Sequence, residues 1–230
     1  MSEMISNSMF FGAIISLAGY EVGLLINRKF QKAIFNPLLI AVIFIICTLL
    51  LLNVSYTQYN DGAKYLSYLL TPTTVCLAIP LYQQFELLKK NIKAISIGIF
   101  SGVLASLSSI FALSLLFGLN HQQYVTLLPK SITTAIGIGI SEELGGMMTI
   151  SVASIIITGI LGNIIAPSIC KLFRIHEPIA KGVAIGTASH AIGTAKAMEM
   201  GEVEGAMSSL AIAVAGLITV VAASVFATFI

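Results

Sequence analysis

Four long, nearly uncharged and mostly apolar runs constrain this chain more than any other feature. They cover residues 36–54, 94–118, 147–173 and 205–230. A helix needs about 20 such residues to cross a hydrocarbon core about 30 Å thick, and each run approaches or exceeds that length. Only 10% of the 230 residues are charged, against about a quarter in ordinary soluble domains. The chain is therefore predicted to be a polytopic membrane protein.

The runs and the segments between them predict an all-α fold in a single transmembrane domain over residues 1–230. We expect about six full spans plus two re-entrant or broken helical segments. Residues 1–32 carry their basic side chains after the apolar run and show no small-residue cleavage site. This stretch is therefore interpreted as a retained first span and not as a signal peptide.

The remaining composition favours neither a metal centre nor a nucleic-acid surface. Cys47, Cys76 and Cys170 all lie in apolar segments, with no disulfide framework and no metal-ligand spacing. The formal net charge of +2 comes from lysines and arginines in the predicted loops. We expect no cofactor and no nucleic-acid partner.

The basic residues form three clusters that indicate the topology. They are Arg28, Lys29 and Lys32 after the first span, Lys89, Lys90 and Lys93 after the third, and Lys171, Arg174 and Lys181 after the run ending at Phe173. Short cytoplasmic loops are enriched in Lys and Arg. With residues 125–146 as a full span, only the first two clusters are cytoplasmic. If residues 125–146 instead form a re-entrant segment, all three clusters are cytoplasmic and the N-terminus is outside. The distribution favours the re-entrant arrangement, with a second dip at 182–202 from the cytoplasmic side.

Two glycine-rich stretches coincide with these dips. Residues 135–145 read AIGIGISEELG and residues 184–193 read AIGTASHAIG, so they share Ala-Ile-Gly, a serine, an ionisable residue and a closing glycine. Related broken segments that enter from opposite membrane faces are typical of inverted-repeat transporters with a midplane site. The pattern predicts an inverted repeat with a solute site between the two dips.

The residue types in these stretches suit a small anionic solute. Half-helix N-termini within a membrane favour carboxylates, hydroxyls add donors, and intramembrane acids or histidines mark proton paths. The predicted substrate-binding residues are Thr133, Thr134, Ser141, Ser189, His190, Thr194 and Lys196, and the predicted proton-coupling residues are Glu142, Glu143 and His190.

Plainer interpretations stay open beside these. Glu142 and Glu143 fit a water-exposed turn between helices, and His190 fits a purely interhelical hydrogen bond. Lys196 fits a side chain that reaches the membrane interface. An enzyme is disfavoured, because adjacent Ser189 and His190 point to different helix faces.

Three stretches resemble the LrgB/CidB family of bacterial membrane proteins. They are 68-YLLTPTTVCLAIPLY-82, 128-LPKSITTAIGIGISEELGG-146 and the region 180–214 with its GTASHAIGTAK string. The resemblance covers nearly the whole chain from the first span onward. It does not separate the antiholin-like LrgB branch from the CidB branch.

The resemblance implies a multi-pass protein of the bacterial cytoplasmic membrane, linked to control of murein hydrolase activity and cell lysis. It also implies a carrier for small monocarboxylates such as pyruvate or glycolate. The expected partners are this carboxylate, the lipid bilayer, a small holin-like membrane protein of the LrgA/CidA type and further copies of the chain. The alternative is a regulator that transports nothing and acts through the holin-like partner.

Overall fold

The computed structural model describes residues 10–30 and 35–230, and within these ranges the regular structure is helical, with no strand. Contacts divide the chain into two compact units, Met1–Cys76 and Leu77–Ile230. Each is described by itself. The prediction of a single domain stays a prediction, and Lys32 of the first basic cluster lies outside the described residues.

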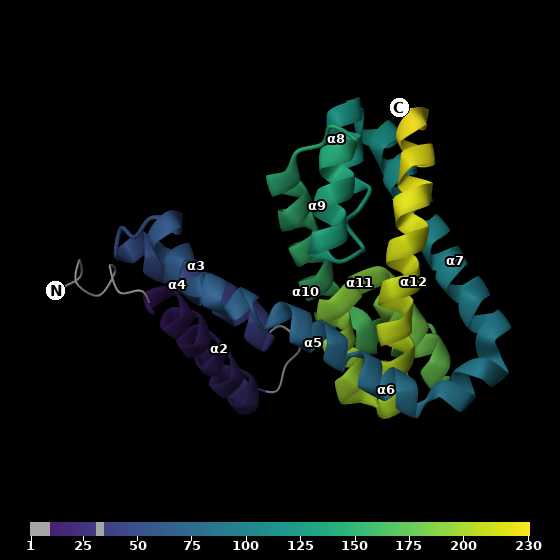
Figure 1. Cartoon of the computed structure of the whole chain (residues 1–230), viewed down its shortest axis with the longest axis horizontal. Helices are drawn as coiled ribbons and strands as arrows, with labels where there is room; N and C mark the ends of the chain where they lie inside the picture. Colours follow the sequence, from purple (N-terminus) through teal and green to yellow (C-terminus); the bar gives the residue numbers. More distant parts are fainter. Residues whose placement is uncertain (1–9, 31–34) are drawn as a thin grey trace. The chain divides into compact units, whose positions relative to one another are not determined.

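The described part of the first unit contains four helices. They are α2 (Phe11–Phe30), α3 (Pro37–Leu51), α4 (Tyr56–Ser67) and α5 (Leu70–Cys76) (Figure 1). Asn36 starts α3, because its side-chain Oδ1 accepts hydrogen bonds from the Leu38 and Leu39 amides at 2.9 and 3.1 Å. Gly19 and Gly23 of α2 are buried against α3, so their Gly-x-x-x-Gly spacing marks close helix packing.

The second unit begins at α6 and contains the predicted dips. Its elements are α6 (Ala78–Gln83), α7 (Phe85–Phe117), α8 (His121–Leu127), α9 (Thr134–Glu143), α10 (Met148–Leu172), α11 (Pro178–Met200), α12 (Glu202–Phe226) and η2 (Ala227–Phe229). Within the described residues, four stretches are long and apolar enough to cross a membrane, namely Tyr56–Gln83, Phe85–Phe117, Met148–Leu172 and Glu202–Phe229. The other two predicted spans correspond to α2 and α3. The all-α, multi-span prediction is confirmed.

Helices α8 and α9 form a hairpin that we call hairpin 1. Pro129 follows α8, and its Cβ lies 3.5 Å from where a side chain on Gly137 of α9 would begin. Farther from the turn, Thr126 of α8 accepts two hydrogen bonds from the start of α10. The Met147 amide donates to its hydroxyl at 2.8 Å, and Ser151 Oγ donates to its backbone carbonyl at 2.7 Å. The chain therefore returns to the end from which α8 entered.

Helix α11 is also a hairpin, which we call hairpin 2. The chain reverses at His190, whose backbone angles are φ 42° and ψ −143°. A side chain on Gly193 would begin 3.1 Å from Cγ2 of Ile185. In a straight helix, residues eight apart are separated by about 12 Å along the axis, so the two halves of α11 must lie side by side.

The two hairpins enter from opposite ends of α12. Tyr124 of hairpin 1 donates to the Phe226 carbonyl at 2.9 Å, whereas Lys181 of hairpin 2 pairs with Glu204 at 3.5 Å. Those two positions on α12 are separated by about 33 Å of helix rise, close to the thickness of a hydrocarbon core. Figure 1 shows hairpin 1 beside the C-terminal end of α12 and hairpin 2 beside its N-terminal half. Two hairpins that enter from opposite ends of α12 agree with the predicted arrangement, and the membrane faces from which they enter stay a prediction.

Close contacts also fix the helix directions. Gly98 and Gly102 of α7 pack against Val183 and Thr187 of hairpin 2, so α7 runs parallel to the entering half of that hairpin. The second and third basic clusters consequently lie at the same end of this unit. Helix α7 leads into hairpin 1, and α10, running the other way, leads into hairpin 2. These are two helix–hairpin units of inverted direction, with α12 packed between them.

Candidate functional site

A pocket of about 1040 Å³ lies where the two hairpin turns approach each other. Its walls come from α7, α10 and the entering half of hairpin 2, and the turn of hairpin 1 closes one side. Most of its surface is apolar. The polar side chains that line it are Asn91, Ser101, Ser106, Ser109, Lys130, Ser131, Thr158, Glu177, Thr187 and Ser189. An apolar pocket with a few convergent polar groups is the usual form of a small-molecule site.

Lys130 supplies the positive charge at the hairpin 1 turn. It follows Pro129, which ends α8, and its Nζ donates to the Ser131 hydroxyl at 3.1 Å. The Ser131 hydroxyl also pairs with Ser106 of α7 at 3.0 Å. Within the described part of the chain, the ion pairs involve Lys64, Lys89, Lys181 and Lys196, and none involves Lys130. A partly buried cation without a carboxylate partner therefore lines the pocket.

Thr187 and Ser189 bring the turn of hairpin 2 to the same pocket. Both are buried, and Ser189 packs directly against Gly162 of α10, where a larger residue would overlap it. Thr187 donates its hydroxyl proton to the Val183 carbonyl at 2.7 Å, which leaves its oxygen lone pairs available. Of the residues predicted from sequence to bind substrate, Ser189 is the one that lines this pocket.

The side chains of His190 and Thr194 on hairpin 2 face the neighbouring helices and not the pocket. Nε2 of His190 is 3.0 Å from the Ile155 carbonyl of α10. Thr194 donates to the His190 carbonyl at 2.9 Å and pairs with Ser208 of α12 at 2.7 Å. Both side chains are buried and hydrogen-bonded between helices, and neither lines the pocket.

The predicted hydroxyls of hairpin 1 lie away from the pocket as well. Thr133 precedes α9 and Thr134 begins it, and neither is a lining residue. Ser141 is fully buried and forms a hydrogen bond with Ser151 Oγ of α10 at 2.7 Å. Its contact holds hairpin 1 against α10.

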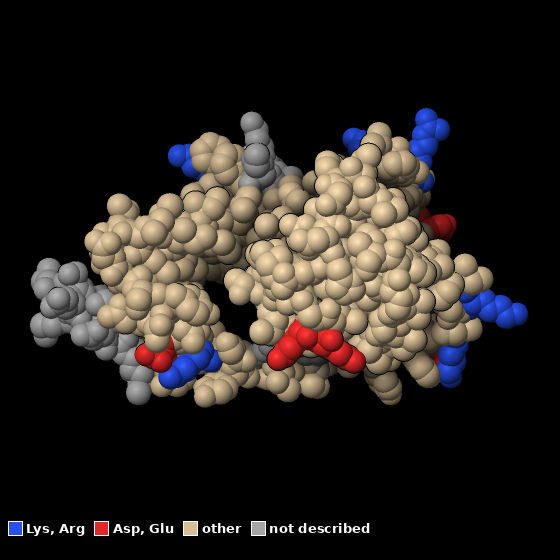
Figure 2. All heavy atoms as spheres, turned by 90° about the horizontal axis from the view of Figure 1, so that it is seen from above, with Lys and Arg blue, Asp and Glu red and all other residues tan. Residues whose placement is uncertain are grey.

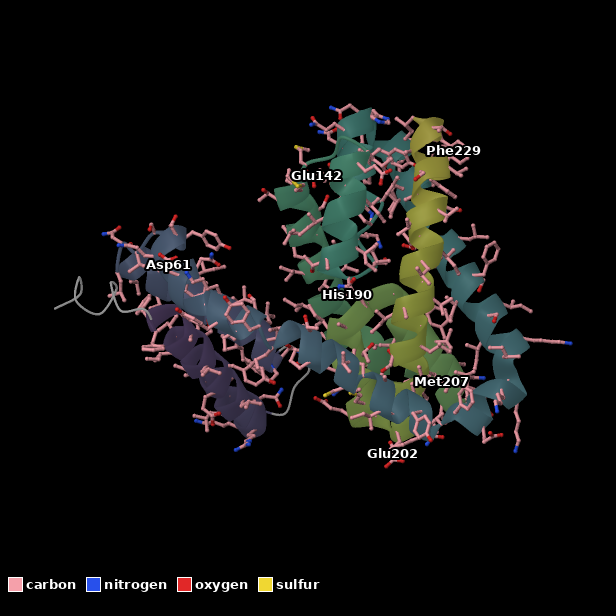
Figure 3. All side chains as sticks on the ribbon, viewed as in Figure 1. Asp61, Glu142, His190, Glu202, Met207 and Phe229 are labelled. Carbon is pink, nitrogen blue, oxygen red and sulfur yellow. The ribbon has the colours of Figure 1, made fainter. Side chains whose placement is uncertain are left out.

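The predicted charged residues lie outside the pocket. Glu142 and Glu143 are exposed at the last turn of α9, and Lys196 pairs with Glu199 at 2.8 Å on hairpin 2. Figure 3 shows Glu142 toward the end of α12 marked by Phe229, Glu202 at the other end and His190 between them. The structure therefore brings together Ser189 and Lys130, and separates Glu142 from His190.

Sequence reasoning missed Lys130, although its signal was visible. Lys130 stands alone in an apolar stretch, outside all three basic clusters, between a helix-breaking proline and a serine. Figure 2 shows how sparse Lys, Arg, Asp and Glu are among the uncharged residues of the visible face. In such a chain an isolated lysine beside a broken helix indicates a functional position.

Inverted helix–hairpin units whose turns meet beside a largely apolar pocket define an all-α, multi-pass membrane protein. The chain belongs to the LrgB-like family, whose profile matches residues 16–229. It is 38% identical over 222 residues to the antiholin-like protein LrgB of Bacillus cereus (strain B4264). It is also 38% identical over 222 residues to the antiholin-like protein LrgB of Bacillus anthracis (strain A0248). Each alignment covers 96% of both chains. No solved structure matches. The family resemblance seen in the sequence is confirmed.

Proposed function

We propose that this protein is a membrane carrier for small monocarboxylates such as pyruvate or glycolate, coupled to protons. The observation that carries the proposal is Lys130, a cation with no carboxylate partner in the described residues, in the pocket where both hairpin turns converge. A charge in such surroundings is costly unless an opposite charge joins it. A bound carboxylate supplies that charge.

The pocket chemistry suits one carboxylate on a small molecule. At about 4 Å, an ammonium and a carboxylate attract each other by about 4 kcal/mol at an effective dielectric constant of about 20. Ser131, Thr187 and Ser189 offer hydroxyls near the same place. A second carboxylate would have no second cation here, because Lys130 is the one basic residue among those lining the pocket.

The opposed hairpins support an alternating-access cycle. The turn of hairpin 1 closes one side of the pocket, and the entering half of hairpin 2 lines it toward the other end of the helical unit. Movement of one hairpin at a time would open one side only. We place the basic clusters of α7 and α10 on the cytoplasmic side, in a bacterial plasma membrane. His190, Glu142 and Glu143 remain proposed proton-coupling residues, and Thr133, Thr134, Ser141, Thr194 and Lys196 proposed contacts in other states of the cycle.

Uptake into proteoliposomes tests this function. Purified wild-type protein is expected to take up radiolabelled pyruvate or glycolate above the rate of empty vesicles. Lys130→Ala should lose at least about tenfold in rate, since about 1.4 kcal/mol of lost attraction corresponds to tenfold. Lys93→Ala, which removes an exposed lysine at the basic end of α7, is the matched control and should keep wild-type uptake.

Two further variants test the residues proposed from sequence. His190→Ala and Glu142→Gln should slow uptake if these groups carry protons, and wild-type rates from both would remove them from the mechanism. Wild-type protein that transports none of the small monocarboxylates would refute the proposed function.

A non-transporting regulator is the second candidate, and the name of the relatives favours it, because they are called antiholin-like. We propose that such a regulator would act on a small holin-like membrane protein, in a family associated with murein hydrolase control. Its assay is the oligomer distribution of that partner in vesicles with and without this protein. Lys130→Ala distinguishes the two, because a regulator would tolerate the change.

A further inference from the structure

Lys130 has a hydrogen-bond partner that suits two protonation states. Its Nζ contacts the Ser131 hydroxyl at 3.1 Å, and that hydroxyl shares a proton with Ser106 at 3.0 Å, where either oxygen can donate. A hydroxyl can accept from an ammonium or donate to a neutral amine. A carboxylate or a carbonyl could only accept, and would hold Lys130 in its charged form. The serine pair therefore accommodates both forms of the amine.

The surroundings of Lys130 contain no nearby counter-charge. Helix α7 from 94 to 117 and helix α10 from 148 to 169 carry no charged or histidine side chain, and α12 carries none after Glu204. On hairpin 1 itself, His121, Tyr124, Glu142 and Glu143 lie toward its base and not at its turn. The empty pocket thus does little to stabilise an ammonium.

The ionisable side chains of hairpin 2 from Lys181 to Glu199 do not line the pocket. Lys181 is paired with Glu204 near the base, and His190 faces the Ile155 carbonyl. Lys196 is paired with Glu199 on the returning half. Glu177 also lines the pocket, but it precedes the entering half of the hairpin, about 18 Å of helix rise before Ser189. A carboxylate entering the pocket is the counter-charge that Lys130 lacks.

From this geometry we infer that Lys130, rather than His190, Glu142 or Glu143, carries the coupling proton. The inference rests on the proposed carrier function and assigns its coupling group. With a carboxylate bound, Lys130 is an ammonium and the pair is neutral. After the carboxylate leaves, the ammonium releases one proton to pocket water and becomes a neutral amine. One proton and one carboxylate therefore cross together, and the empty carrier returns uncharged.

Thermodynamic linkage makes this inference measurable without transport. If a bound carboxylate favours the ammonium, then protonation favours carboxylate binding by the same factor. Binding should draw a proton from the buffer wherever the free carrier holds Lys130 as an amine. Isothermal titration calorimetry of purified protein with pyruvate, repeated in buffers of different ionisation heat, counts these protons.

The expected result is proton uptake that rises with pH toward about one proton per pyruvate, as a lysine amine requires. Zero uptake across about pH 6 to about pH 9 would overturn the inference, because Lys130 would then be charged with or without its ligand. The same titration separates two failures. Protein that binds no pyruvate refutes the proposed function, whereas binding without proton uptake refutes only the assignment to Lys130.

A variant with a permanent positive charge at position 130 provides a second test of the inference. Arginine stays protonated in proteins, so Lys130→Arg should bind pyruvate with no proton uptake. In proteoliposomes this variant should still exchange labelled for unlabelled pyruvate. Its pyruvate uptake should not become faster when an inwardly directed proton gradient is applied, whereas that of the wild type should. Lys93→Arg is the matched control. Proton uptake that persists in Lys130→Arg but disappears in His190→Gln would assign the proton to His190 and overturn the inference. Should Lys130→Arg bind nothing, the wild-type proton count alone decides.

Discussion

Replacing Gly186 with alanine tests the packing that holds hairpin 2 against α12. Gly186 is buried in the entering half of the hairpin, and a Cβ there would overlap the Ser208 carbonyl and lie 2.9 Å from both Ser208 Cα and Ala211 Cβ. Non-bonded carbons prefer about 3.5 to 4.0 Å, so the two helices would have to separate by roughly 0.6 to 1 Å. Backbone atoms form much of this contact, and no side-chain rotation can relieve it.

The size of the effect follows from two opposing contributions. Overpacking of this kind costs about 1 to 3 kcal/mol, and alanine recovers about 1 kcal/mol relative to glycine inside a helix. The free energy of unfolding should therefore fall by up to about 2 kcal/mol. For a chain of this size, 1 kcal/mol moves Tm by about 2 to 4 °C, so Tm should fall by up to about 8 °C.

The matched control is the same substitution where space is free. Gly139 lies exposed in α9, and nothing stands within 4 Å of its would-be Cβ. Gly139→Ala should therefore raise stability by up to about 1 kcal/mol through helix propensity alone. Thermal unfolding of both variants in one detergent, followed by fluorescence-detected size exclusion, measures the difference. A Gly186→Ala protein as stable as Gly139→Ala would refute the described packing.

Other changes probe hairpin 2 and the topology. Thr194→Val should destabilise by about 1 to 3 kcal/mol, because it leaves the buried Ser208 hydroxyl without its 2.7 Å partner; an unchanged Tm in the same detergent assay would contradict this. His190→Gly should be more stable than His190→Ala by about 1 to 3 kcal/mol, because glycine tolerates φ 42° and ψ −143° and alanine does not. Equal Tm values for the two variants would contradict the described turn. On a cysteine-free background, single cysteines at Gly145 and His176 should be labelled from opposite membrane faces by an impermeant maleimide; labelling from one face would contradict the opposed hairpins.

The sequence allowed the two hairpins to be predicted because charge placement constrains chain direction. The cluster at Lys171, Arg174 and Lys181 required residues 125–146 to return to their starting side, and the structure shows that turn just after Pro129. Gly98 and Gly102 have the Gly-x-x-x-Gly spacing that is typical of close helix packing, and both glycines face hairpin 2. Long-range charge rules and small-residue spacing depend little on side-chain detail, so sequence alone reveals them.

The pocket could not be predicted in the same way, because which side chains face it depends on rotation about each helix axis. His190 and Ser189 are neighbours in sequence, yet one faces α10 and the other lines the pocket. Lys130 was passed over because it lies between two helices too short to count as spans. Hydropathy treats a charge in that position as part of a loop. Only the folded chain places its neighbour Ser131 beside Ser106, 25 residues earlier.

The return of each hairpin to its own side has a consequence for how the chain is made. A segment that turns back adds no crossing, so hairpin 1 leaves every later helix with the orientation it would have had without it. Straightening that turn into one continuous helix would add a crossing and invert all that follows, carrying Lys171, Arg174 and Lys181 to the opposite compartment. The proline and lysine at the turn of hairpin 1 therefore bear on the insertion of the whole C-terminal half during synthesis, and substitutions there should be checked for inverted protein before any loss of activity is interpreted.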